Sequence, residues 1–234
     1  LSQKTLRPLF EEYGISVKDQ GNRGTCSIFA VVGLIEFERA HVLKDTTRLS
    51  VEYLNWAANR IEGVDEDGSF FHFAIDGLVK YGVCADDYMP YATRFSALAE
   101  PSEAAKQDAS QRRIGKQVWI KKWDPTTGVT EEQLQAIRLE LDYDHPVAIG
   151  FRWPKRDVNR YLDGGELAIV NSDQVYDGHS VLIVGYQDDS DTPGGGYLIF
   201  KNSHGEKFGD KGYGRIPYRY AEMYANDAMA LHLH

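Results

Sequence analysis

Cysteine is scarce in this chain. Only Cys26 and Cys84 occur among its 234 residues, which allows at most one internal disulfide. The fold therefore cannot depend on a covalent framework, and core packing must hold it together. This cysteine usage is compatible with a cytosolic protein or with a bacterial secreted one, and it does not separate the two. We predict that Cys84 is a buried thiol, because nothing around it in the sequence suggests a reactive role.

Long apolar runs are absent as well. No stretch approaches the roughly 18 to 20 apolar residues that a membrane span needs, so we expect no membrane partner. The opening "LSQKTLRPLFEEYG" lacks the charged-then-apolar order of a secretory signal. A signal or a pro-segment could still have been removed before this numbering begins.

Positive charge is sparse and scattered. The net charge is -9, and the only basic concentration is "QRRIGKQVWIKKW" at 111–123. Phosphate binding needs a concentrated basic face, so we expect no nucleic-acid partner and interpret this stretch as a solvated strand edge. The motifs HExxH, GxxxxGK[ST], GxSxG and CxxC are missing, which leaves zinc peptidase, nucleotide hydrolase, serine hydrolase and dithiol redox functions without support. The C-terminal "HLH" could bind a metal adventitiously, but its simpler interpretation is a strand end or a tail.

Helical patterns fill the first half of the chain. Residues 26–43 are apolar on every side of the helical wheel for three turns and become amphipathic only near Glu36 and Arg39, the pattern of a helix buried within a domain. Two shorter helical patterns follow, at 50–61 with Ser50 as its cap and at 70–82 ending in glycine. The polar segment 92–113 predicts a solvated connection with a helical piece, and there we place the change from one lobe to the other.

Strand patterns dominate the second half, interrupted by one helical pattern at 130–141 that opens with Thr130. Short runs rich in Val, Ile and aromatic residues are separated by Gly, Pro and Asp clusters. These runs are "KQVWIKKW", "PVAIGF", "SVLIVGYQ", "GYLIFKNS" and "YGRIPY". Helices first and mostly antiparallel strands second predict an α+β protein with two lobes.

Cys26 lies where a glycine-broken loop, "QGNRGTC", becomes the buried helix. Unpaired N–H groups and the positive end of the helix dipole stabilise a thiolate, so we predict a lowered pKa for this thiol. The alternative is a small apolar core residue. The loop favours the reactive interpretation, because Gly21 and Gly24 allow close backbone approach and Gln20 supplies an amide donor.

A thiolate nucleophile needs a base and a group that orients the base. His179 lies at the start of one apolar strand and Asn202 at the end of the next, and a hairpin of these strands would bring both to the same end. The geometry permits a contact between them. For His179 alone, the competing interpretation is a histidine with a purely structural role, whose ring nitrogens already have hydrogen-bond partners.

Taken together, these segments resemble the papain family of cysteine peptidases. "QGNRGTCSIFA" is similar to the nucleophile segment of that family, "GHSVLIVGY" to its histidine strand and "KNSHGEKFGDKGYGRI" to its asparagine strand. "LSVEYL", "VKYGVCADDYMPY" and "HPVAIGF" also fall in family order, so the resemblance spans nearly the whole chain. The sequence pattern of the opening residues is most similar to that of bacterial members.

The resemblance implies one papain-like domain over residues 1–234. Its helical lobe would cover about 15–110, and an antiparallel β-barrel-like lobe would cover about 111–234 together with 1–14. The active-site cleft would lie between these lobes. The resemblance implies no cofactor and no metal.

The resemblance also implies catalytic roles. Cys26 would be the nucleophile, and His179 would pair with it as an imidazolium and protonate the leaving amine. Asn202 would orient the imidazole, and Gln20 with the backbone N–H of Cys26 would form the oxyanion hole. A thioester acyl-enzyme would then be hydrolysed.

Substrate contacts follow from the same resemblance. Gly68 and Ser69 would pair with an extended peptide backbone, and the carbonyl of Gly178 would make the next contact. The main specificity pocket would be formed by Phe71, Gly150 and Ser180. This pocket predicts a bulky apolar side chain at the second position before the cleaved bond. Endopeptidase action on a peptide or protein is the default, with an inhibitory pro-segment as a possible further partner.

Three positions depart from the family pattern. Arg23 replaces a cysteine of a local disulfide, Ser27 replaces the tryptophan after the nucleophile, and His204 replaces the tryptophan that shields the asparagine–histidine contact. We expect a wetter imidazole as a result, with His204 packing on it rather than competing for a proton. Two alternatives stay open: a papain-fold acyltransferase or amidase, and a catalytically silent relative that binds peptides.

Overall fold

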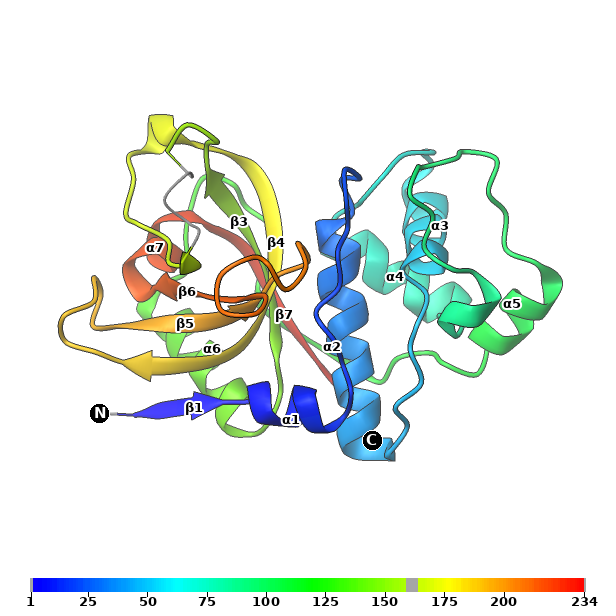
Figure 1. Cartoon of the computed structure of the whole chain (residues 1–234), viewed down its shortest axis with the longest axis horizontal. Coiled ribbons are helices and arrows are strands. Elements are labelled where there is room, and N and C mark those ends of the chain that lie inside the picture. Colours follow the sequence, from blue (N-terminus) through cyan, green and yellow to red (C-terminus); the bar gives the residue numbers. More distant parts are fainter. Residues whose placement is uncertain (1, 159–163, 234) are drawn as a thin grey trace.

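Two lobes lie side by side in the computed structural model, which describes residues 2–158 and 164–233 (Figure 1). One lobe is mainly helical and the other is built on a sheet. The helices are α1 (Arg7–Glu12), α2 (Cys26–Leu43), α3 (Val51–Glu62), α4 (Phe71–Tyr81), η1 (Asp86–Tyr88), α5 (Glu103–Ala109), α6 (Glu131–Asp142), η3 (Ser172–Gln174) and α7 (Tyr218–Tyr224). The strands are β1 (Gln3–Thr5), β2 (Lys116–Lys121), β3 (Val147–Pro154), β4 (Val175–Asp188), β5 (Gly196–Lys201), β6 (Tyr213–Pro217) and β7 (Ala225–His232).

The helices begin and end at local sequence signals. The Ser50 side chain accepts a hydrogen bond from the Tyr53 N–H at the start of α3, and Thr130 forms a capping box with Gln133 at the start of α6. Gly82 ends α4 with a φ of 72°, a conformation that glycine adopts without steric cost. The helices predicted at 26–43, 50–61, 70–82 and 130–141 are therefore confirmed.

Helix α2 runs along the boundary between the lobes (Figure 1). It packs on α3 and α4 on one side and on β3, β4 and β7 on the other. The prediction of a buried helix is confirmed. The predicted amphipathic end is confirmed only in its last turn: Arg39 and His41 are half-buried there, whereas Glu36 and Glu38 are buried.

The sheet has the strand order β2-β7-β3-β4-β5-β6, with β1 paired to β4, and its named strands pair antiparallel. The five strands expected from the sequence are confirmed, and β2 lies at the edge of the sheet as predicted. The short β1 and the C-terminal β7 were not predicted from the pattern. The α+β two-lobe fold expected from the resemblance is confirmed.

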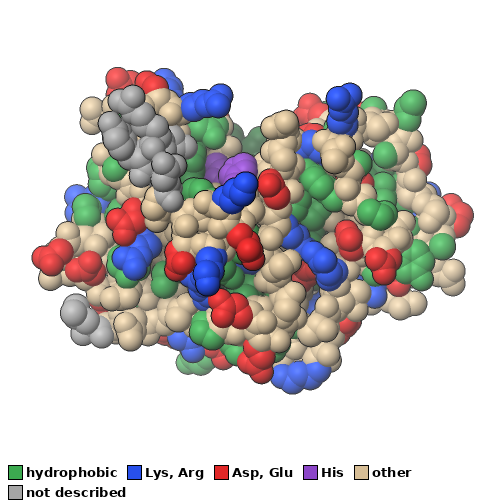
Figure 2. Space-filling model, in the orientation of Figure 1, with side chains coloured by type: hydrophobic (Ala, Val, Ile, Leu, Met, Phe, Trp, Pro, Cys, Tyr) green, Lys and Arg blue, Asp and Glu red, His purple; other side chains and the backbone are tan. Residues whose placement is uncertain are grey.

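The pairing of β4 with β5 positions the site. Leu182 pairs with Lys201, so His179 and Asn202 lie at the same end of these two strands. The first turn of α2 packs beside that end, and in the space-filling view histidine side chains lie at a depression between the lobes (Figure 2). In the described part of the chain no helix is long and apolar enough to cross a membrane. Of the connection that precedes His179, residues 159–163 lie outside the described residues.

Candidate active site

Cys26 is the first residue of α2, and its side chain lines a cavity of about 260 Å³ between the lobes. The thiol is free of any disulfide. The backbone N–H of Ser180, from the facing β4, donates a hydrogen bond to Sγ at 3.5 Å. A helix start in one lobe and a strand in the other thus meet at this sulfur. Cys84 is a free, fully buried thiol, as predicted.

The protonation of Cys26 differs from the sequence prediction. Burial raises the pKa of this thiol above its ordinary value, although backbone N–H groups of Ser180, Ser27 and Cys26 itself act to lower it. The helix start provides the expected donors, but removal of the sulfur from water has the larger effect. The predicted low pKa is therefore wrong for this arrangement.

His179 and Asn202 meet as the hairpin argument required. His179 Nε2 lies 2.7 Å from Asn202 Oδ1, which also accepts the Ser203 N–H at 2.9 Å. Burial lowers the pKa of His179 to about 4, while the hydrogen bond to Asn202 acts in the opposite direction. The ring is therefore neutral at pH 7, and within the described residues no hydrogen bond joins it to the Cys26 thiol. The predicted imidazolium is not present in this arrangement, because both charged forms are penalised by burial.

The imidazole of His179 is well covered. Only 5% of the residue is exposed. His204 stacks on it with ring centroids 5.2 Å apart and planes at 14°, so the predicted packing of His204 is confirmed. Trp153 of β3 contacts the ring edge-on at 4.7 Å. The expectation of a wetter imidazole is wrong, because Trp153 supplies cover that the sequence pattern did not reveal.

Gln20 is held in a fixed orientation beside the nucleophile loop. Its Nε2 donates to the Arg23 carbonyl at 2.9 Å, and its Oε1 accepts from Ser203 Oγ at 2.6 Å. The amide nitrogen carries two hydrogens, and among the described residues only Arg23 accepts one of them. The second hydrogen is therefore available for a ligand.

Arg23 occupies the position of the missing disulfide. It is buried and makes a two-pronged contact with Glu52, with Nη1–Oε2 at 2.7 Å and Nη2–Oε1 at 3.2 Å. It also binds Asp67 at 2.8 Å and the Ala92 carbonyl at 2.8 Å, and its guanidinium lies 4.5 Å from the centre of the Tyr91 ring. Burial alone would lower the pKa of Arg23, but the hydrogen bonds to Asp67 and Glu52 raise it. Charged contacts thus tie the nucleophile loop to its neighbours at the position where the resemblance implies a disulfide.

Ser27 and Gly68 organise the predicted peptide-pairing segment. The Ser69 N–H donates to Ser27 Oγ at 3.3 Å. The Gly68 N–H donates to Asn55 at 2.9 Å, and its carbonyl accepts from Asn59 at 3.4 Å. With φ at +76° and the Gly24 carbonyl 2.2 Å from where a Cβ would stand, Gly68 leaves no room for a side chain. The backbone N–H groups of Gly68 and Ser69 are therefore both engaged by side chains of the protein.

The remaining predicted substrate contacts also border the cavity. Its wall includes every residue that the resemblance assigned to substrate, together with acidic side chains and Trp123 that the resemblance did not assign. The full lining is Gly24, Cys26, Ser27, Glu62, Glu66, Asp67, Gly68, Ser69, Phe70, Phe71, Trp123, Gly150, Gly178, Ser180, Asn226 and Asp227. The predicted residues are therefore brought together around one cleft.

Asp227 is the functional candidate that the sequence reasoning missed. It is buried, and its Oδ1 accepts the Gly150 N–H at 3.2 Å. A Cβ at position 150 would lie 2.4 Å from this oxygen, so glycine there makes room for the carboxyl group. Burial raises the pKa of Asp227 to about 7, although Gly150 and Lys121 act to lower it. The sequence pattern did not point to Asp227, because the strand that carries it, β7, was not predicted from that pattern.

Comparison with known families agrees with this geometry. The model of the family described as "Papain family cysteine protease" matches residues 11–231. The chain therefore belongs to the papain family of cysteine proteases.

Individual relatives are distant. The chain is 28% identical to an uncharacterized peptidase C1-like protein of Acanthamoeba polyphaga mimivirus, over 88% of the chain and 65% of that protein. It is 30% identical to the viral cathepsin of Spodoptera litura multicapsid nucleopolyhedrovirus, over 85% of the chain and 52% of that protein. The chain thus spans between about half and two thirds of the length of these curated relatives.

Solved structures share the fold. Xylellain, a cysteine protease from Xylella fastidiosa, superposes with a TM-score of 0.80 at 24% identity, over 99% of the chain and 86% of that structure. Digestive procathepsin L 3 of Tenebrio molitor superposes with a TM-score of 0.71 at 22% identity, over 100% of the chain and 70% of that structure. At these identities the likeness concerns the fold.

Proposed function

We propose that the chain is an active thiol peptidase that hydrolyses peptide bonds through a thioester on Cys26. The observation that carries the proposal is the buried His179–Asn202 pair at 2.7 Å beside a free thiol that lines a cleft. A base held by an orienting group next to a nucleophile is the arrangement that nucleophilic catalysis requires. Binding alone would need none of these groups, which argues against a silent relative.

The neutral pair defines the proposed first step. With the Cys26 thiol protonated and the His179 ring neutral, the ring must accept the thiol proton as the sulfur attacks the peptide carbonyl. Contacts of this kind tighten when substrate fills a site. His179 then donates the proton to the leaving amine, and water hydrolyses the thioester.

The oxyanion contacts are proposed from Gln20 and the backbone N–H of Cys26. The hydrogen bonds from Ser203 and to Arg23 hold the Gln20 amide in place before substrate arrives. A donor that needs no reorganisation stabilises the developing charge most effectively, typically by roughly 3 to 4 kcal/mol.

The decisive test is labelling of the full chain with an epoxide inhibitor of thiol peptidases, followed by peptide mapping. We expect modification at Cys26, loss of peptide hydrolysis on labelling, and neither effect in Cys26→Ala. Hydrolysis that persists in Cys26→Ala would overturn the proposal. Added amines that capture the acyl group faster than water does would favour the acyltransferase alternative instead.

Substrate preference is proposed from the cavity wall. Phe71, Gly150 and Ser180 support a bulky apolar side chain at the second position before the cleaved bond, and the default action is that of an endopeptidase. Asp227 adds a condition to this preference. Below pH 7 its carboxyl group is neutral and suits apolar side chains, whereas above pH 7 the carboxylate suits a basic side chain.

Profiling of a peptide library at pH 5.5 and pH 8.5 tests this preference. We expect apolar residues to dominate at the lower pH. At the higher pH, the preference for arginine relative to apolar residues should rise roughly tenfold, because one charged hydrogen bond contributes about that much to binding. Asp227→Asn should remove the change while hydrolysis persists. Acidic residues at this position, or a profile independent of pH, would contradict the assignment.

The lobe boundary, a pro-segment and the source of the chain are three further parts of the proposal. The lobes divide near residue 110, with residues 1–14 joining the sheet lobe, which the pairing of β1 with β4 supports. A pro-segment could occupy the cleft, because one structural neighbour is a procathepsin. A bacterial source rests on the texture of the opening residues alone, since the named curated relatives are viral.

A further inference from the structure

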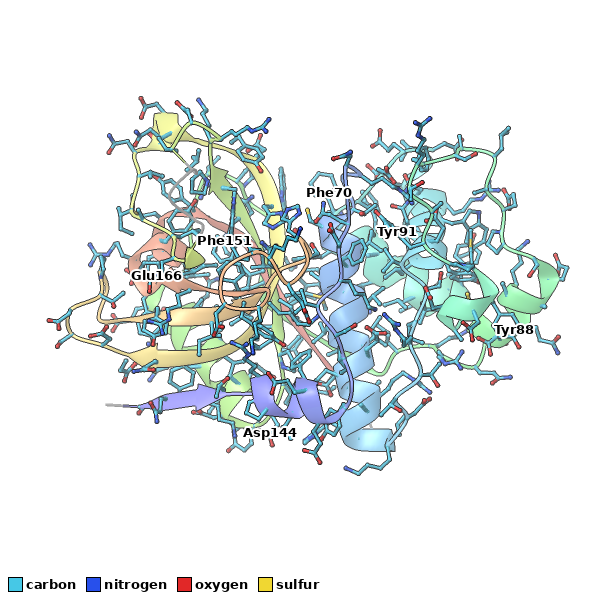
Figure 3. All side chains as sticks on the ribbon, in the orientation of Figure 1. Phe70, Tyr88, Tyr91, Asp144, Phe151 and Glu166 are labelled. Carbon is cyan, nitrogen blue, oxygen red and sulfur yellow. The ribbon has the colours of Figure 1, made fainter. Side chains whose placement is uncertain are left out.

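A cluster of histidine and glutamate side chains lies far from the cleft, toward the C-terminal end of α2. Glu38 is on α2, Glu140 is near the end of α6, His145 follows in the turn before β3, and His232 ends β7. Cys26 and Glu38 are separated by roughly 18 Å along the helix axis at 1.5 Å per residue. In Figure 3, Phe70 marks the cleft end of α2, and Asp144, next to His145, marks the opposite end.

Two hydrogen bonds and one ring contact organise this cluster. His145 Nδ1 lies 2.8 Å from Glu38 Oε1, and His232 Nε2 lies 2.7 Å from Glu140 Oε2. The two imidazole rings stack with centroids 3.9 Å apart. One ligand atom each from Glu140, His145 and His232 falls within 4.8 Å of the other two. Three groups that commonly bind transition metals thus converge on a small volume.

From this convergence we propose that Glu140, His145 and His232 form a binding site for a divalent transition-metal ion, of which zinc is the best match. Two imidazole nitrogens with one carboxylate form a ligand set that zinc uses and that calcium and magnesium do not favour. The active-site proposal does not depend on this site.

Glu38 supplies the supporting contact that such sites require. When His145 donates its Nδ1 hydrogen to Glu38 Oε1, Nε2 of that ring keeps a lone pair for a metal. A metal-bound histidine typically makes this bond to a carboxylate through its other nitrogen, which fixes both the tautomer and the ring orientation. Glu38 therefore has the position of an orienting residue and not of a ligand.

The second oxygen of Glu38 provides an independent indication. Glu38 is fully buried, and its Oε2 has no hydrogen-bond partner among the described residues. A buried carboxylate oxygen without a partner carries a free-energy cost that a nearby dication would reduce. No described Lys or Arg side chain forms an ion pair with Glu38, whose described side-chain partner is His145.

The dimensions suit zinc after a small adjustment. Zinc bonds to nitrogen and oxygen are roughly 2.0 to 2.2 Å long, which places tetrahedral ligand atoms roughly 3.3 Å apart. The Glu140–His232 pair would open slightly as the metal replaces the proton between them, and the two rings would tilt out of their stack. All three ligand side chains are partly exposed, which gives the ion a path and leaves room for a water as fourth ligand.

Such an ion would tie three segments of the sheet lobe together and, through the contact between His145 and Glu38, hold them against α2. Glu38 belongs to the helix that runs along the boundary, whereas Glu140, His145 and His232 belong to elements that pack around the sheet. A metal held by these three residues would fix the turn before β3 and the end of β7 against α2. We therefore expect zinc to raise the thermal stability of the whole chain.

The test uses the chain of residues 1–234 with Cys26→Ala, so that zinc cannot bind the catalytic thiol. After removal of metal with a chelator, zinc chloride is titrated by calorimetry, and thermal unfolding is recorded with and without zinc. We expect one zinc per chain with a micromolar or tighter Kd and a higher Tm. Cobalt(II) in place of zinc should give the visible absorption of a tetrahedral site.

Variants separate this site from chance binding. His145→Gln or Glu140→Gln should abolish both the stoichiometric binding and the Tm increase. Glu38→Gln should weaken binding about 10- to 100-fold while the ligands remain. His41→Gln changes a neighbouring histidine of α2 that is outside the ligand set, and the zinc-dependent Tm increase should be kept. Millimolar binding in the Cys26→Ala chain, or binding unchanged by His145→Gln, would overturn the proposal.

Discussion

The two walls of the cleft are held by different kinds of interaction. On the nucleophile wall, the buried Arg23 joins Glu52 and Asp67 through short charged hydrogen bonds. On the imidazole wall, the rings of Trp153 and His204 enclose His179. The first wall is fixed by charge pairing in a site shielded from water, and the second by the packing of rings.

This difference predicts different responses to mutation. A buried charge network fails when one member is removed, because the remaining charges are left without partners in a poorly solvated site. Ring packing degrades gradually, because a substituted ring still excludes part of the water. We therefore expect large losses from changes on the nucleophile wall and graded losses on the imidazole wall.

Arg23→Ala has the largest expected effect. It leaves the buried carboxylate of Glu52 and the partly exposed carboxylate of Asp67 without their cation, so the free energy of unfolding should fall by about 3 to 5 kcal/mol. Urea denaturation measures this change. The exposed pair of Arg60 and Glu100 offers a matched control, and Arg60→Ala should cost about 1 kcal/mol or less. Equal losses in the two variants would contradict the proposed role of the buried network.

Asn202→Ala is expected to have an intermediate effect. Without the hydrogen bond at 2.7 Å, the His179 ring keeps its cover but loses its fixed orientation. We expect kcat for peptide hydrolysis to fall roughly 10²-fold, as misplacement of a catalytic group does, with KM little changed. Steady-state kinetics on one peptide substrate measure both. A fall confined to KM would show that Asn202 acts on substrate binding instead.

His204→Trp has the smallest expected effect. A tryptophan can keep the stack on His179, so activity should change by less than about threefold if His204 acts by packing. The pH dependence of kcat/KM provides the second readout and should be unchanged. A large fall in activity would mean that His204 does more than shield the imidazole.

Much of the fold followed from local patterns. Ser50, Thr130 and Gly82 mark helix ends through backbone geometry that involves only their nearest neighbours. The short β1 has too few residues to show a period, and β7 reads "ANDAMALH", where polar residues interrupt the apolar pattern. Both strands exist because distant partners complete their hydrogen bonds, and no local pattern carries that information.

The candidate active site likewise has a part that the sequence predicted and a part that it did not. The contact between His179 and Asn202 followed from two strands and the connection between them. The cover from Trp153 and the acidic group of Asp227 did not, because these residues reach the cleft through strand pairings between β3, β4 and β7. The protonation of Cys26 also required the structure, since the extent of burial sets the larger contribution to its pKa.

The sequence by itself determined the α+β class, the principal helices and the order of the nucleophile, histidine and asparagine segments. These depend on side-chain period, capping residues and short spacings, which are properties of neighbouring residues. Only the tertiary structure decided that Arg23 pairs with Glu52 and Asp67, that the His179 ring is dry and neutral, and that Glu38 is buried beside two histidines. Burial and charge pairing arise between residues far apart in the chain, and they exist only once the two lobes have packed together.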